Sequence, residues 1–306
     1  MGKQKPIYVH SEINTSMEEL WKYTQSPDLH TAWDLRFTEI NYLDKKPNEP
    51  QKFLYQTKIG FGLAITGTGE TAGQVHKENG ERISSLKFST EHPLSLIREG
   101  RGYWKYTQTK KGIEFETQYD YETNFGKIGR IIDAYLFRPV LGWATAWSFD
   151  SLRLWIENDL HPKQSLQKTF TYWTVCFLLA FVWFYQGFVP KLIVSHPEEV
   201  NMLSATIGSS IDAIMAVQFV GIAEMLFGLI WLFPFNKRKL FIVHAGIILV
   251  LTVTAWLANP NSFIQPFNPI TLNLLMIGLS IIGYANSDQL PSAKNCRRIR
   301  SRGTRD

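Results

Sequence analysis

The sequence predicts two structural classes in series. An α+β domain, in which a curved antiparallel sheet grips a long C-terminal helix, precedes an all-α bundle of four membrane-spanning helices. Up to about residue 164 charges are frequent and apolar residues alternate in short runs, as in half-buried strands. Residues 126–158 carry apolar side chains at helical spacing, which predicts the long helix. From 169 to 285 the apolar residues merge into stretches of bilayer length, about 17–25 residues each.

The charge distribution favours a membrane protein over a nucleic-acid-binding one. The 306-residue chain has a net charge of +5, concentrated in the C-terminal segment KNCRRIRSRGTRD. Beside a bilayer such a cluster indicates contact with anionic lipids on the cytoplasmic side, so we expect membrane lipids and no nucleic acid as partners. The first residues, MGKQKPIYVHSEI, include no continuous apolar segment, so we expect no signal peptide.

The soluble half begins with an alternating run at 7–14, which predicts a strand. Ser16 followed by Glu19 predicts a capping box for the helix MEELWKYTQ, and PDLHTAWD ends that helical region. Further strands are predicted for the alternating runs at 35–43, 51–59, 62–76, 82–90, 96–108 and 112–123. The glycines of GFGLAITGTGETAG should mark bulges that curve the sheet. Pro139 should kink or break the long helix.

The membrane half should contain four spans, at about 169–190, 210–235, 240–258 and 267–285. The expected domain boundaries are a soluble domain at 1–160, a linker at 161–168, a membrane domain at 169–286 and a basic cytoplasmic tail at 287–306. Lysine and arginine gather before the first span, in NKRK between the second and third, and after the fourth. The opposite loops hold Lys191 alone, so both termini should be cytoplasmic.

Glu224 lies near the middle of the second span, where a charge costs roughly 2.5–3.5 kcal/mol on insertion scales. Gly221 and Gly228 share its helical face, which predicts close helix packing and a Glu224 side chain directed into the bundle. The candidate ligand-binding residues of this half are Glu224, His244, Asn273 and Lys191. Three readings of Glu224 stay open. It is a protonated group hydrogen-bonded between helices, a site for a proton or quinone-like headgroup, or a contact to another subunit.

Chemical motifs are sparse in both halves. There is no Gly-x-Ser-x-Gly, His-Glu-x-x-His or paired Cys-x-x-Cys pattern, and Cys176 and Cys296 form neither a disulfide framework nor a metal set. We therefore name no catalytic residue, metal or cofactor, and we assign no reaction. The ligand-binding candidates of the soluble half are Trp33, Arg101, Tyr119 and Asp133, polar or aromatic groups that could enter a cavity beside the long helix.

Two resemblances add to this interpretation. The segments FVWFYQGFVPKLIVSHPEE, GIAEMLFGLIW and QPFNPITLNLLMIGLS resemble the DoxX-like family of four-helix bacterial membrane proteins, over about residues 169–286. That resemblance implies a four-helix bundle, and some relatives associate with quinone-linked oxidoreductase complexes. INTSMEELWKYTQSPDLHTAWDLRFTEI is similar to the opening of START-like proteins, the polyketide cyclase or lipid-transport superfamily. This second resemblance covers about residues 5–158 and implies a helix-grip fold with an apolar pocket.

Three functions are compatible with these features. The leading hypothesis is a membrane-anchored protein that binds or handles a hydrophobic ligand, such as a lipid, isoprenoid or quinone, at the cytoplasmic face. The second is an accessory subunit of a quinone-linked membrane oxidoreductase, with Glu224 in a proton or quinone site and the oxidoreductase subunits as partners. The third is a structural scaffold in the membrane.

Overall fold

A computed structural model describes residues 4–45, 49–60, 62–78, 80–207, 212–266 and 268–300. The predicted starts of the second and fourth spans, at 210 and 267, lie outside these ranges, as do the basic residues after 300. The chain divides into two compact units. One comprises Met1–Ser165 together with Pro291–Asp306, and the other comprises Leu166–Leu290.

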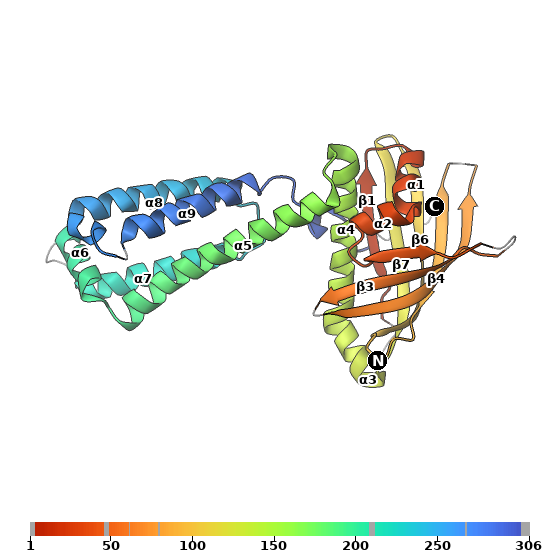
Figure 1. Cartoon of the computed structure of the whole chain (residues 1–306), viewed down its shortest axis with the longest axis horizontal. Coiled ribbons are helices and arrows are strands. Elements are labelled where there is room, and N and C mark those ends of the chain that lie inside the picture. Colours follow the sequence, from red (N-terminus) through yellow and green to blue (C-terminus); the bar gives the residue numbers. More distant parts are fainter. Residues whose placement is uncertain are drawn as a thin grey trace. The chain divides into compact units, whose positions relative to one another are not determined.

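The first unit is built on one seven-stranded antiparallel sheet of strand order β1-β7-β6-β5-β4-β3-β2 (Figure 1). All the predicted alternating runs form strands, although the run at 35–43 is a strand only over its second half. The strands are β1 Ile7–Ile13, β2 Glu39–Tyr42, β3 Lys52–Gly60, β4 Leu63–His76, β5 Arg82–Ser89, β6 Ile97–Thr109 and β7 Gly112–Thr123. A register shift between Thr71 and Gly73 confirms a bulge in the glycine-rich segment.

Two short helices follow β1. Helix α1 spans Met17–Gln25 and α2 spans Pro27–Trp33. The Ser16 hydroxyl accepts from the Glu19 backbone N–H at 3.2 Å, which confirms the predicted N-cap. In the predicted capping box the Glu19 carboxylate would accept from the Ser16 backbone N–H. It accepts instead from the Thr15 hydroxyl at 2.6 Å.

The long C-terminal helix of this unit is continuous through Pro139 but changes its winding. Helix α3 spans Gly126–Ile132, a π-helical turn η1 spans Asp133–Phe137, and α4 spans Arg138–Asn158. A proline ring collides with the carbonyl four residues earlier and supplies no N–H. A wider turn before Pro139 accommodates the ring, so the predicted kink takes the form of a π turn.

Helix α4 packs against β1, and the core lies between this helix, α1 and α2, and one face of the sheet (Figure 1). The rings of Phe115 and Phe149 stack with centroids 4.4 Å apart, which joins β7 to α4. Trp33 is buried against both Trp104 and Phe149. The side of α4 nearer its C-terminus is therefore filled with packed aromatic side chains.

The basic C-terminal segment is not a separate tail in its described part, contrary to the predicted boundary at 287. Residues 291–300 pack on the first unit and include the short turn η4 Ala293–Asn295. The buried Asp150 carboxylate accepts from the Ser292 backbone N–H at 2.8 Å and from the Asn295 amide at 2.7 Å. Arg297 pairs through its backbone with His10, on the edge of β1. This pairing protects an otherwise open strand edge.

The second unit is helical. Its elements are α5 Pro162–Gln186, the π-helical turn η2 Gly187–Ile193, α6 Pro197–Ile207, α7 Ala213–Ile230, α8 Arg238–Ala258, the 3-10 turn η3 Pro260–Phe263 and α9 Pro269–Ala285. Helices α5 with η2, α7 and α8 are long and apolar enough to cross a membrane, and α9 is a shorter apolar helix. Two expectations are corrected. The linker at 161–168 is helical from Pro162, and α6 occupies the expected outer loop.

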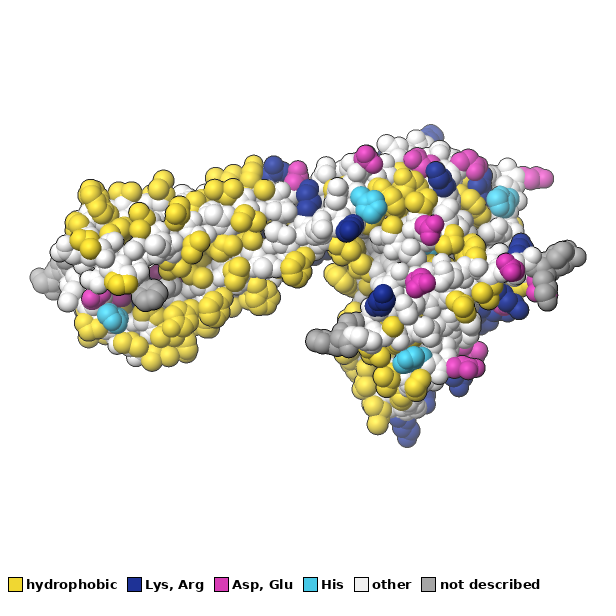
Figure 2. All heavy atoms as spheres, viewed as in Figure 1, with side chains coloured by type: hydrophobic (Ala, Val, Ile, Leu, Met, Phe, Trp, Pro, Cys, Tyr) yellow, Lys and Arg dark blue, Asp and Glu magenta, His cyan; other side chains and the backbone are white. Residues whose placement is uncertain are grey.

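Hydrophobic side chains cover much of the outside of this unit (Figure 2). Phe170, Phe219 and Leu257 each expose about two thirds or more of their surface. Soluble domains do not carry continuous apolar surfaces of this size, whereas a lipid bilayer covers them at no cost.

One loop side chain behaves differently from the prediction. Lys237, in the expected positive loop, is buried among aromatic rings and donates to the Phe233 carbonyl at 2.5 Å.

Candidate functional site

Glu224 lies beside a lysine within the helical unit. Its Oε2 is 3.1 Å from Lys191 Nζ, and the same ammonium is 3.3 Å from Glu199 Oε1. Lys191 is provided by η2, Glu224 by α7 and Glu199 by α6. The Lys191 side chain is only 10% exposed, so one cation is shared by two carboxylates in a largely enclosed place. The opposite charges offset much of the cost of placing Glu224 in the bundle.

Two glycines allow this contact. A Cβ on Gly187 would collide with the Gly221 carbonyl, and a Cβ on Gly221 would lie 2.7 Å from the Gly187 carbonyl and 2.8 Å from Lys191 Cβ. The backbones of η2 and α7 therefore touch at this point. Pro190 lies inside η2, where the wider π winding accommodates its ring as at Pro139. The π turn also directs Lys191 toward α7.

The other two membrane candidates lie in separate contacts. His244 Nε2 accepts from the indole N–H of Trp183 at 2.9 Å, and its Nδ1 is 2.6 Å from the Ser280 hydroxyl. Because the indole N–H can only donate, Nε2 is the acceptor nitrogen. This assigns the neutral tautomer with its proton on Nδ1. Asn273 donates to the Thr252 hydroxyl at 2.8 Å. The four candidates thus form one charged cluster and two separate helix–helix contacts, those of His244 and of Asn273, and not a single site.

Two soluble-half candidates are core residues. Trp33 is 1% exposed, and its indole N–H donates to the Tyr23 carbonyl at 3.0 Å. The Tyr119 hydroxyl is 2.8 Å from that of Thr145 on α4, and burial raises the pKa of Tyr119. Arg36, which the sequence did not single out, lies with its guanidinium 5.3 Å from the Tyr119 ring centroid.

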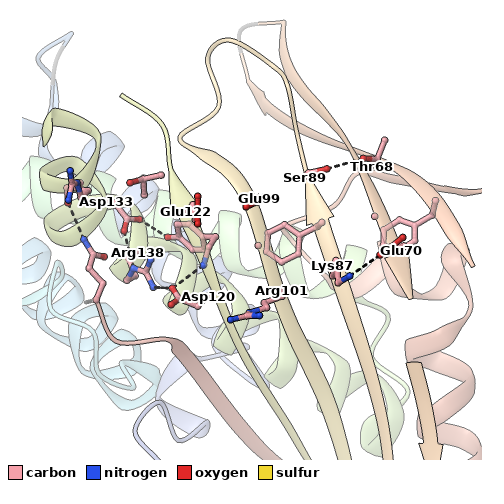
Figure 3. Close-up of a pocket in the computed structure, with 18 of the residues that line it drawn as sticks. Thr68, Glu70, Lys87, Ser89, Glu99, Arg101, Asp120, Glu122, Asp133 and Arg138 are labelled. Atoms are coloured by element: carbon pink, nitrogen blue, oxygen red, sulfur yellow. Dashed lines mark hydrogen bonds and ion pairs between the residues drawn. The ribbon is translucent and has the colours of Figure 1, made fainter. Parts of the chain in front are cut away.

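Arg101 and Asp133 line a cavity of about 1400 Å³ (Figure 3). It lies between strands β3–β7 and the start of the long helix, at the end of the sheet that lies before the first residue of β1. One row of its lining runs across the sheet through directly paired residues: Phe53, Gly69, Phe88, Gly100 and Tyr121. A Cβ at Gly69 or Gly100 would collide with the ring of Phe53 or Phe88, so each ring lies over a glycine. These rings form an apolar floor.

The neighbouring row is charged and, because successive residues on a strand point to opposite faces, it lies on the other side of the sheet from this floor. Its members are also paired across the strands: Lys52, Glu70, Lys87, Arg101 and Asp120. Lys87 and Glu70 form an ion pair at 3.4 Å. Arg101 is exposed and has no hydrogen-bond or ion-pair partner within the described ranges. The lining therefore includes aromatic side chains from one face of the sheet and charged side chains from the other.

Asp133 belongs to the wall of this cavity. The Tyr121 hydroxyl donates to its Oδ1 at 2.6 Å, and Arg138 Nε donates to its Oδ2 at 3.0 Å. Arg138 also donates to Asp120 at 2.9 Å and lies 4.3 Å from the Tyr121 ring centroid (Figure 3). Burial, with the Asp133 hydrogen bond, raises the pKa of Tyr121 well above its ordinary value. Each carboxylate oxygen of Asp133 thus accepts a hydrogen bond from a neighbouring residue of the wall.

Among the described residues, no group of three or more His, Cys, Asp or Glu side chains could hold a metal ion. The cavity borders on aromatic rings from one face of the sheet and on the Arg101 guanidinium from the other.

The comparisons with known proteins agree with a membrane assignment. The membrane protein YndG of Bacillus subtilis (strain 168) is 44% identical over 301 residues, which covers 98% of this chain and 100% of that protein. The chain belongs to the YndG family. Residues 180–281 of this chain match the model of the DoxX-like family. The matched range includes Lys191 and Glu224.

Solved structures similar to this YndG-family chain include two from other families. A STAR-related lipid transfer protein from Xanthomonas axonopodis is 11% identical, covering 40% of this chain and 79% of that chain with a TM-score of 0.32. Ginseng major latex-like protein 151 from Panax ginseng is 12% identical, covering 49% and 97%, with a TM-score of 0.33. The N-terminal fold itself is the helix-grip arrangement, a seven-stranded antiparallel sheet against a long C-terminal helix.

Sequence reasoning missed several residues that build these sites. Glu199 lies in the segment FVWFYQGFVPKLIVSHPEE, which resembles the DoxX-like family, but was not among the candidates, although it shares Lys191 with Glu224. Phe53 and Phe88 sit in ordinary alternating strands, so only their partners across the sheet, Gly69 and Gly100, could have indicated an aromatic floor.

Proposed function

We propose that this protein is a membrane-anchored binding protein for an amphiphilic ligand, a polar-headed lipid or isoprenoid, which its soluble domain exchanges with the bilayer. The observation that carries the proposal is the 1400 Å³ cavity, because it is large enough for an acyl or isoprenoid segment. Its aromatic floor favours the apolar chain of such a ligand.

Lipid analysis of the full chain tests the proposal. The wild-type protein and an Ala134→Trp variant would be purified in the same detergent, and their bound lipids compared by mass spectrometry. Ala134 lines the cavity from η1, so the indole should project into it and obstruct part of the space next to the helix. We expect at least one lipid species bound to the wild type and depleted in Ala134→Trp. Identical lipid profiles in the two proteins would overturn the proposal.

Two further variants sharpen the result. Arg101→Gln should reduce the bound species if its head is acidic and leave it unchanged if the head is neutral. Val75→Trp is the matched control, because Val75 is an exposed residue of β4 that does not line the cavity. The full chain is used because residues 1–160 alone would lack the segment 291–300 that covers β1.

We further propose that α9 completes a fourth span and that both termini are cytoplasmic. Residues 4–165 and 291–300 belong to one compact unit, so the chain between them crosses the bilayer an even number of times. Helices α5, α7 and α8 supply three crossings, and the apolar α9 supplies the fourth. The positive residues near 163–168, 236–239 and 294–300 support the cytoplasmic side. Reporter fusions at Ser195, Asn236 and the C-terminus should read outside, inside and inside, and an inside signal at Ser195 would contradict this topology.

A second candidate function rests on the charged cluster of the membrane unit. An accessory subunit of a quinone-linked oxidoreductase would need a group that exchanges protons within the bilayer, and Glu224 shares Lys191 with Glu199 there. In that case an oxidoreductase subunit should co-purify in mild detergent, and Glu224→Gln should abolish the electron transfer of the complex while leaving its assembly intact.

A further inference from the structure

The outer side of the α3–η1–α4 segment carries an unpartnered apolar stripe. Its exposed members recur every three or four residues, from the start of α3 to the second turn of α4. They are Phe125, Ile128, Ile131, Ile132, Tyr135, Leu136, Val140 and Trp143. Tyr135 exposes 82% of its surface and Ile128 exposes 69%, values that are far above those of the core face of the same helix. Figure 2 shows hydrophobic side chains gathered over α3.

The charges on this segment have one sign. Lys127 and Arg130 are exposed, and the single acidic residue between 125 and 143, Asp133, is buried and paired with Arg138. A helix that combines bulky apolar residues, aromatic residues and cations without an exposed acid has the composition of helices that lie in the interface of an anionic bilayer. A protein partner would require an acidic patch of matching shape, whereas an anionic lipid surface needs no such match.

The covalent connection keeps this stripe near lipid. Helix α4 ends at Asn158, and α5, which continues into the first candidate span, begins at Pro162. From Pro162 to the apolar residues at 169 is about 10 Å of helix at 1.5 Å per residue, and from Trp143, the last member of the stripe, to the end of α4 is about 22 Å. A surface tethered within a few tens of ångströms of a bilayer needs little intrinsic affinity to remain bound, because the tether supplies a high effective concentration.

We propose that the α3–η1–α4 stripe docks on the anionic surface of the membrane that anchors the protein, with its apolar side chains in the headgroup region. The same segment lines the cavity through Arg130, Asp133 and Ala134. Docking therefore brings one wall of the cavity to the lipid surface. The inference goes beyond the proposed ligand binding, because a docked stripe is detectable whether or not the cavity is occupied.

Site-directed fluorescence on the full chain tests docking. Single cysteines at Ile128 and Tyr135 would be labelled with an environment-sensitive dye, and the protein reconstituted in nanodiscs of phosphatidylglycerol and phosphatidylcholine containing headgroup-proximal nitroxide lipids. Cys176 and Cys296 are both buried, so labelling is confined to the introduced thiols. The control position is Val75, which is also apolar and exposed but lies on β4. We expect blue-shifted, nitroxide-quenched emission at 128 and 135 and neither effect at 75.

Variants give the test a second arm. Leu136→Asp with Val140→Asp should abolish the quenching at 135, and because both side chains are exposed, the melting temperature should be unchanged. Lys127→Ala with Arg130→Ala should weaken the quenching in phosphatidylglycerol more than in pure phosphatidylcholine.

Three outcomes would overturn docking. The first is absence of quenching at the stripe, and the second is equal quenching at position 75. The third is a blue shift that depends on two protein copies per nanodisc and not on the nitroxide lipid, which would mean that a second copy of the chain covers the stripe.

Discussion

Asp34 is enclosed in the first compact unit, with Arg36 2.6 Å and His30 3.0 Å from its carboxylate. Burial alone would raise the pKa of this carboxyl, but Arg36 and His30 outweigh burial and hold its pKa below the ordinary range. We predict that Asp34→Asn lowers the free energy of unfolding at pH 7 by about 3–5 kcal/mol, because Arg36 then keeps its burial cost without a counter-charge. Denaturant unfolding of the purified chain measures this loss.

The same pair predicts a pH dependence. A depressed folded pKa contributes stability that is complete above the unfolded value of about 3.9 and is lost as the pH falls through the folded pKa. Between pH 5 and pH 3 the melting temperature of the wild type should therefore fall more steeply than that of Asp34→Asn. Parallel curves for the two proteins would show that Asp34 does not contribute to acid sensitivity.

Lys191 and Glu224 should differ in their importance for stability. Removing the charge of Glu224 with Glu224→Gln leaves Lys191 paired with Glu199 at 3.3 Å. Lys191→Met instead leaves two carboxylates without their shared cation, so we predict a loss of about 3–5 kcal/mol for Lys191→Met and a clearly smaller loss for Glu224→Gln. Thermal unfolding in detergent measures both, and the double variant should recover part of the Lys191→Met loss. Equal losses in the single variants would contradict the shared arrangement.

At the scale of elements, close packing between η2 and α7 should be sensitive to a single methyl group. A Cβ on Gly221 would lie 2.7 Å from the Gly187 carbonyl, so Gly221→Ala should separate the two backbones and cost about 1–3 kcal/mol. Gly246 on α8 is the matched control, because a Cβ there meets no atom within 4 Å. Gly246→Ala should be neutral or stabilising by up to about 1 kcal/mol, since alanine favours the helix. A comparison of melting temperatures decides this, and a similar effect of both substitutions would refute the packing argument.

The π turns explain why the Asp133–Arg138 and Lys191–Glu224 contacts could not be predicted from helical spacing. Asp133 and Arg138 are five residues apart, which would direct them about 140° apart on a regular α-helix. The π turn Asp133–Phe137 brings them onto one side, where they pair at 3.0 Å. The sequence shows the proline that follows each π turn or lies within it, but not the winding with which the chain accommodates it.

At the scale of the whole molecule, the return of the C-terminal segment to the soluble domain predicts the reactivity of Cys296. Its thiol donates to the Ala146 carbonyl at 3.3 Å, and burial raises the pKa of the thiol to about 12. Maleimide should therefore label Cys296 slowly at pH 8, because little thiolate is present and access is blocked.

Asp150→Ala removes the carboxylate that holds Ser292 and Asn295, so labelling of Cys296 should become at least several-fold faster. Glu157→Ala is the control, because Glu157 shares Arg153 with Asp150 but does not contact the C-terminal segment. Fast labelling of the wild type, or equal rates in the two variants, would show that this segment is not held by Asp150.

The order of the two halves, nearly every strand, the long helix and the apolar helices of the membrane unit could be predicted from the sequence. These follow from local periodicity, which each segment expresses wherever it lies in the fold. The sequence also indicated that Gly221, Glu224 and Gly228 share a packed face, since i, i+3 and i+4 residues coincide on any α-helix. It could not assign a partner to Glu224, because Lys191 is 33 residues away and reaches it through a π turn.

Which polar residues meet became clear only from the folded chain. Trp33 and Tyr119 were candidates for a ligand site and are core residues, whereas Arg101 remains exposed at a cavity whose floor is formed by Phe53 and Phe88. The segment 291–300, expected as part of a free basic tail, is held by Asp150, about 140 residues earlier in the sequence. Charge and hydropathy report the solvent a segment prefers, but a contact between distant residues depends on strand register and helix packing, which only the folded chain establishes.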